Sequence, residues 1–135
     1  MRLGLVSALL TAHPGTSDFL LGGVVSYANA VKIEQLGVDA GVLEAHGAVS
    51  AEVARQMADG ARQRFHADLA LSLTGIAGPS GATPEKPVGL VYYALSTPTE
   101  TLVRDVNVSH RPREGIQLYA AWCGLNLIRE HLLAH

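Results

Sequence analysis

Residues 69–108 read LALSLTGIAGPSGATPEKPVGLVYYALSTPTETLVRDVNV, and this stretch decides the fold. Three short apolar runs, at 69–74, 88–96 and 101–108, have the length and composition of β-strands. A short connection separates the last two runs, so we expect them to pair as an antiparallel hairpin, with the second run at the sheet edge. A long loop rich in Gly and Pro follows the first run, where a ligand would bind in an open α/β sheet.

Helical patterns flank these strands in the sequence. Ser50 is a good N-cap, and apolar residues recur at helical spacing after it: Ala54, Met57, Ala58, Ala61 and Phe65. Further helices are expected over residues 1–12, 28–36, 39–45 and 112–133, and a buried strand over residues 22–27. This order of elements predicts a three-layer αβα fold, in which helices cover both faces of a mixed β-sheet.

The composition restricts the class of protein. A length of 135 residues suits one domain, spanning 1–135, and 48% hydrophobic with 16% charged residues indicates a globular chain. A net charge of −2 supplies no basic surface for nucleic acid or for a membrane, so we expect a small molecule or a protein as partner. The lone Cys123 fits a reducing cytoplasm, and the six histidines lack ligand spacing, so we assign no metal and no cofactor.

A tyrosine and a lysine lie where the strand predicted at 22–27 passes into the next helix. If Lys32 were desolvated, its amine could be partly neutral and could take a proton from a hydroxyl nucleophile. The hydroxyl of Tyr27 would be placed to relay that proton or to hydrogen-bond. A solvated surface lysine is the alternative, and the residues alone favour it.

The Gly- and Pro-rich loop and the start of the last helix are two further candidate sites. Glycines let backbone N–H groups approach a phosphate or carboxylate, although the loop matches neither the dinucleotide-binding pattern nor the P-loop. Arg111 could hold a phosphate together with the helix N-terminus. A purely structural loop and an exposed arginine are the alternatives. The loop candidates are Thr74, Gly75, Ile76, Ala77 and Gly78.

Motifs in a fixed order link these segments to a known family. The pattern G-x-V-x-Y-x-N-x-x-K occupies residues 23–32, followed by L-G-V at 36–38 and H-G-A-V-S-A-E-V-A at 46–54. The stretch T-G-I-A-G-P…P-E-K-P-V-G then covers 74–89. Over roughly residues 14–89 the chain resembles the CinA C-terminal, or PncC-type, nicotinamide-nucleotide amidase family.

The resemblance implies an activity and roles for particular residues. The family hydrolyses the carboxamide of nicotinamide mononucleotide to nicotinate mononucleotide and ammonia, with a serine nucleophile activated by a lysine that matches Lys32. The neighbouring tyrosine matches Tyr27, and residues 74–81 would line the nucleotide site. Arg111 matches an arginine on the phosphate side, although Ser109-His110 and Gly115 replace a Gly-Asp pair and a further arginine of the family.

The family's serine motif, E-S-C/L-T-G-G, does not occur in this sequence. In the family it lies just before the helix expected here from Arg2, after a helix and a first sheet strand. A misassigned start, a truncation or a natural variant would each explain the difference. We therefore expect either an amidase whose active form includes upstream residues, or a catalytically silent nucleotide-binding or interaction module. The chain as written should be inactive, and a partner chain could cover its open sheet edge in a homo-oligomer.

Overall fold

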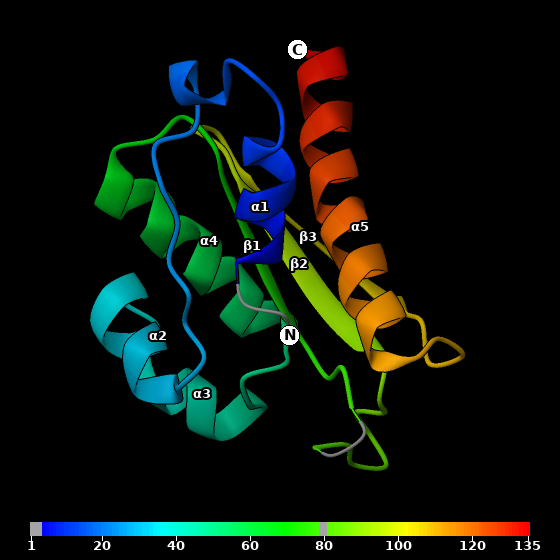
Figure 1. Ribbon diagram of the computed structural model, residues 1–135. Helices are drawn as coiled ribbons and strands as arrows, with labels where there is room; N and C mark the ends of the chain where they lie inside the picture. Colours follow the sequence, from blue (N-terminus) through cyan, green and yellow to red (C-terminus); the bar gives the residue numbers. More distant parts are fainter. Residues whose placement is uncertain (1–3, 79–80) are drawn as a thin grey trace.

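The computed structural model describes residues 4–78 and 81–135, which form five α-helices and a three-stranded sheet (Figure 1). The strands are β1 (Ala70–Gly75), β2 (Leu90–Ser96) and β3 (Thr101–Asn107). The helices are α1 (Leu5–Thr11), α2 (Asn29–Leu36), α3 (Ala40–His46), α4 (Ala51–Phe65) and α5 (Arg113–Ala134), with a 3-10 turn, η1 (Thr16–Asp18). Each predicted helix is thus present, although residues 1–3 of the first lie outside the described residues.

The sheet has the order β1-β2-β3 and both of its strand pairs are antiparallel. The predicted hairpin and the edge position of β3 are confirmed, and Tyr93 lies opposite Arg104 in its register. The prediction of a mixed sheet is wrong for the described residues, because no parallel pair is present.

The strand predicted over residues 22–27 is also wrong. This segment is not assigned to a strand, and no backbone hydrogen bond joins it to another described residue. Its Val and Tyr residues are of types enriched in strands. A β-ladder also requires a neighbouring strand within hydrogen-bond distance, and the segment has none in the described part of the chain.

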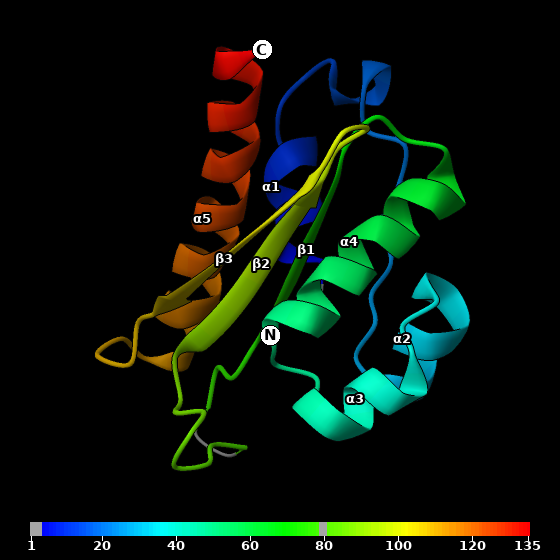
Figure 2. The same cartoon turned by 180° about the vertical axis from the view of Figure 1, so that it is seen from behind.

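The two faces of the sheet pack against different helices. In β1, Ser72 points toward α4, since its Oγ donates to the carbonyl of Ala54 at 2.6 Å. The alternate residues Leu71 and Leu73 lie against Gly124 of α5. Figures 1 and 2 show α4 and α5 on opposite sides of the sheet, with α1 beside α5.

Helix α4 forms the centre of its layer and positions α2. The backbone N–H of Val53 donates to the Oγ of Ser50, which confirms Ser50 as the N-cap. Gly60 lies against the end of α2 so closely that a Cβ there would be 1.7 Å from the carbonyl oxygen of Leu36. The missing side chain lets α2 pack on α4, and α2 carries Lys32.

In residues 4–78 and 81–135, no helix is both long and apolar enough to cross a membrane.

Candidate functional site

Lys32 is a buried lysine, with only 6% of its surface exposed. Its Nζ donates to the main-chain carbonyl of Ser26 at 2.7 Å and lies 3.3 Å from that of Tyr27. Both carbonyls belong to the extended segment that precedes α2, so the chain folds back over its own lysine. Burial lowers the pKa of the Lys32 amine below its ordinary value of 10.5.

These contacts are compatible with either protonation state of the amine. An uncharged lysine nitrogen has two N–H bonds and one lone pair, and the carbonyls of Ser26 and Tyr27 can accept both N–H groups. The lone pair then remains for the proton of a hydroxyl group. The surroundings of Lys32 are therefore those of a candidate general base.

A cavity of about 1140 Å³ opens beside this lysine. It extends along β1 and is bounded by residues of α1, α2, α5 and the extended segment before α2. Among the described residues, β1 pairs with β2 alone, and the segment at 22–27, which also lines the cavity, makes no backbone–backbone hydrogen bond. Its lining includes the lysine itself, residues of the sequence motifs and a buried glutamine: Tyr27, Asn29, Lys32, Thr74, Gly75 and Gln117.

The cavity brings together some of the predicted site residues. Lys32, Tyr27, Thr74 and Gly75 line it, so the motif at 23–32 and the start of the loop do meet. The cavity lining does not include Ile76, Ala77, Gly78 or Arg111. Pro79 and Ser80, in the predicted nucleotide loop, lie outside the described residues.

Tyr27 contacts Lys32 through its main chain. Its carbonyl lies at 3.3 Å from Nζ, while 73% of the residue is exposed. The structure gives no hydrogen bond for its hydroxyl group among the described residues. Proton relay through that hydroxyl stays a prediction.

The loop after β1 is tied to its surroundings at several points. The hydroxyl of Thr74 donates to the carbonyl of Ala48 at 2.8 Å, so this hydroxyl has a structural role that links β1 to the segment before α4. Ala77 is buried in the core, and Gly78 has a φ of +77°, which glycine adopts without steric cost. A Cβ at Gly78 would also lie 2.7 Å from the side chain of Val88.

The two arginines at the start of α5 differ in their contacts. The guanidinium of Arg111 lies 4.8 Å from the centre of the Tyr119 ring, a cation–π geometry. Arg113 instead donates through Nη1 to the carbonyl of Gly78, in the candidate loop. Arg111 was the predicted phosphate contact. Arg113, two residues later in the sequence, was not predicted to be a site residue.

Two other polar residues were missed. Gln117 is buried and lines the cavity from α5, where a polar residue between apolar neighbours was the available signal. Lys86 donates through Nζ to the carbonyl of His46. The described residues contain no group of three or more His, Cys, Asp or Glu side chains that could hold a metal ion.

The sequence model of the CinA C-terminal domain matches residues 3–132. This chain belongs to the CinA C-terminal domain family. A CinA-like protein of Mycolicibacterium paratuberculosis is 48% identical over 133 residues, covering 96% of this chain and 31% of its own length. A CinA-like protein of Geotalea daltonii is 48% identical over 131 residues, covering 97% of this chain and 32% of its own. The chain thus spans about a third of the length of these CinA relatives.

Solved CinA structures have the same fold. The competence/damage inducible protein CihA from Agrobacterium tumefaciens is 38% identical, with a TM-score of 0.92 over 94% of this chain and 78% of that one. A competence-damaged protein (CinA) superfamily protein from Escherichia coli is 29% identical, with a TM-score of 0.88 over 93% and 72% of the two chains. The α/β architecture described above is therefore that of CinA superfamily proteins.

Proposed function

We propose that Lys32 is the general base of a Ser-Lys amidase site that hydrolyses the carboxamide of nicotinamide mononucleotide. The observation that carries this proposal is the Lys32 amine, which is buried, has its pKa lowered by burial, and borders a large cavity. A buried lysine without a carboxylate partner is unusual, and perturbed lysines are concentrated at functional sites. Family membership and the motifs at 23–32 and 74–89 supply the substrate class.

The proposed reaction needs one base acting twice. The Lys32 amine takes the proton of a serine hydroxyl while the serine oxygen attacks the carboxamide carbon. The resulting ammonium returns a proton to the leaving nitrogen, and ammonia departs as the carbon–nitrogen bond breaks. A water molecule, deprotonated in the same way, then cleaves the acyl-serine ester to give nicotinate mononucleotide and free serine.

The nucleophile is the part that this sequence does not provide. Ser72 donates its hydroxyl to the carbonyl of Ala54, and Ser26 contacts Lys32 through its carbonyl. We propose that the serine comes from an E-S-x-T-G-G segment outside these 135 residues and enters the cavity beside β1. The 135 residues alone should then bind the nucleotide without hydrolysing it.

The proposal also covers the residues that contact the nucleotide, the oligomeric state and the location of the protein in the cell. The loop at 74–78 would face the nucleotide, and Arg111 and Arg113 would provide positive charge on its phosphate side. We also propose a cytoplasmic homo-oligomer, since an open strand edge and exposed apolar side chains favour association.

Ammonia release from nicotinamide mononucleotide tests the proposal. The purified 135-residue protein should give no release above buffer. A fusion that places the E-S-x-T-G-G region of an active family member ahead of Arg2 should release ammonia and form nicotinate mononucleotide. Robust turnover by the 135-residue protein would show that its nucleophile lies within these residues. A folded fusion that binds the nucleotide without turnover would contradict the amidase proposal.

A catalytically silent nucleotide-binding or interaction module is the second candidate. The observation that favours it is the sequence itself, which holds the lysine and loop motifs but no E-S-x-T-G-G. Product formation by the fusion separates the two, since both candidates predict binding in titration calorimetry and the silent module alone predicts binding without ammonia release.

A further inference from the structure

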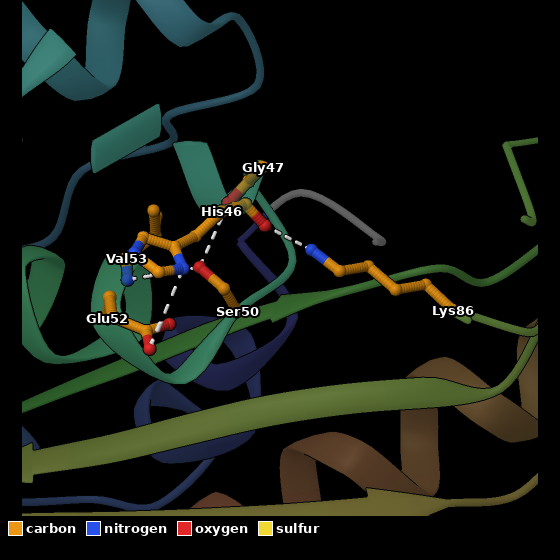
Figure 3. Close-up of polar contacts among 6 residues, drawn as sticks. All are labelled: His46, Gly47, Ser50, Glu52, Val53 and Lys86. Atoms are coloured by element: carbon orange, nitrogen blue, oxygen red, sulfur yellow. Dashed lines mark hydrogen bonds and ion pairs between the residues drawn. The ribbon is translucent and has the colours of Figure 1, made fainter. Parts of the chain in front are cut away.

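The corner between α3 and α4 accepts three side-chain hydrogen bonds on three consecutive carbonyls. The carbonyl of His46 accepts from the Nζ of Lys86, and that of Gly47 from the Oγ of Ser50 at 2.9 Å (Figure 3). The carbonyl of Ala48 accepts from the hydroxyl of Thr74 at 2.8 Å. Ser50 also caps α4, so the corner is continuous with a regular helix.

Two of these three donors flank or belong to the Gly- and Pro-rich loop. Thr74 is the next-to-last residue of β1, directly before the loop, and Lys86 lies in the loop shortly before it returns to β2 at Leu90. Both ends of the loop are therefore fastened to the same short corner. The contact of Arg113 with the carbonyl of Gly78 fastens the loop from the opposite side, that of α5.

Lys86 and the corner fit one another closely. His46 is the last residue of α3, where carbonyls lack partners within the helix and attract a cation. Gly47 has a φ of +78°, and a Cβ there would lie 3.0 Å from the Nζ of Lys86. Glycine at position 47 thus gives the chain its turn and leaves room for the amine to reach the carbonyl.

We propose that Lys86 is a positioning residue, which holds residues 81–88 of the loop in their ligand-accepting position through the carbonyl of His46. Lys86 does not touch the nucleotide in this scheme, and both the identity of the ligand and the part of the loop in binding it rest on the proposed function. The aliphatic stem of Lys86 spans the distance between the loop and the corner, and its ammonium group donates the hydrogen bond to the carbonyl of His46. Loss of that end should loosen the loop and weaken binding.

Hydrogen exchange of the 135-residue protein tests the loop without any ligand. In Lys86→Met, the amides of residues 81–89 should exchange roughly tenfold faster, as expected when a hydrogen bond to a charged group is lost. The arginine variant, Lys86→Arg, should restore protection because a guanidinium can donate to the same carbonyl. Glu85→Gln is the matched control, since Glu85 is an exposed neighbour and the described structure gives it no hydrogen bond or ion pair. Unchanged loop exchange in Lys86→Met would overturn the proposal.

A second variant approaches the same bond from the other side. Gly47→Ala should also speed exchange of residues 81–89, because the new methyl group crowds the amine of Lys86. If the two substitutions break one contact, their effects on exchange will not add in the double variant. Additive effects would mean that Lys86 does not act through this corner.

Nucleotide affinity completes the test. Calorimetry with nicotinamide mononucleotide should give a Kd about tenfold higher for Lys86→Met, while Lys86→Arg and Glu85→Gln stay near wild type. A loosened loop with unchanged affinity would overturn the positioning role. If wild type does not bind the nucleotide, the proposed function fails, and the exchange experiment still decides whether Lys86 holds the loop.

Discussion

Lys32 stands apart from the other lysine of the chain by its burial. The family resemblance implied a catalytic lysine at this position, whereas the residues alone favoured a solvated one. The structure buries it, because the segment before α2 folds back and offers its carbonyls to Nζ. Such a fold-back depends on main-chain geometry, which side-chain identity does not encode. For the same reason the sequence could not show that Tyr27 contacts Lys32 through its carbonyl.

The base role of Lys32 predicts a large loss of turnover. In the fusion that carries the serine motif, Lys32→Met should lower kcat by about 10²–10⁴-fold, the usual range for loss of a general base. Methionine keeps the apolar stem and removes the amine. The control is Glu34→Gln, an exposed residue on the same helix, which should keep full activity. A folded Lys32→Met enzyme with most of its kcat would require another base.

Burial of Lys32 also predicts how stability depends on pH. The pKa of its amine is lower in the folded chain than in the unfolded one, so between these two values the unfolded chain binds more protons. The contribution of Lys32 to the free energy of unfolding therefore rises with pH in the window below 10.5. Urea titrations of wild type and Lys32→Met from neutral pH upward should show this rise in wild type only. Parallel pH profiles would mean that the Lys32 pKa is the same in both states.

At the level of elements, the sequence predicted every helix and the hairpin but misjudged how segments meet. Ser50 and the apolar spacing after it defined α4, and a short connection defined the β2–β3 pair. The segment at 22–27 contains Val and Tyr, which are common in strands. A strand also needs a partner strand, and that partner is often distant in sequence. The contact of Gly60 with the end of α2 was likewise hidden, because a glycine inside a helix normally indicates only weak helix propensity.

The packing of Gly60 predicts that an alanine at this position lowers stability, the opposite of what helix propensity predicts. Alanine in a helix interior normally stabilises by about 1 kcal/mol relative to glycine. Gly60→Ala should instead destabilise the protein by about 1–3 kcal/mol, because its methyl group would overlap the carbonyl of Leu36. Gly115→Ala in α5 is the matched control, since its Cβ would make only ordinary contacts and should stabilise. Denaturant unfolding of both variants measures the difference, and a stabilised Gly60→Ala would contradict the close α2–α4 packing.

For the whole molecule, the sequence predicted an α/β fold of the CinA family but not the arrangement of its surfaces. The mixed sheet was inferred from alternating elements, whereas the described strands pair only in antiparallel fashion. The final helix was expected over residues 112–133, and α5 exposes the large apolar side chains of Leu118, Tyr119 and Trp122. Which apolar residues remain uncovered depends on the assembled packing, so periodicity could not reveal this surface.

These exposed residues predict that the protein associates with itself through α5. Trp122, the only tryptophan of the chain, is 54% exposed and should become buried in the assembly. Light scattering should then show a mass above that of the monomer, with a shift of tryptophan emission to shorter wavelength as concentration rises. Leu118→Glu should restore the monomer and the emission of exposed tryptophan. Association without an emission change would place the contact elsewhere, for example at β1.

The unpaired edge of β1 also bears on how the protein behaves in storage and during expression. Its residues, ALSLTG, carry no charge and no proline, the two devices by which natural edge strands discourage further pairing. Copies that meet at this edge can add strands one after another, and nothing in such growth closes it into a ring. Concentrated stocks of the 135-residue protein should therefore seed thioflavin-positive fibrils, while the fusion, whose added segment is proposed to enter the cavity beside β1, should remain clear.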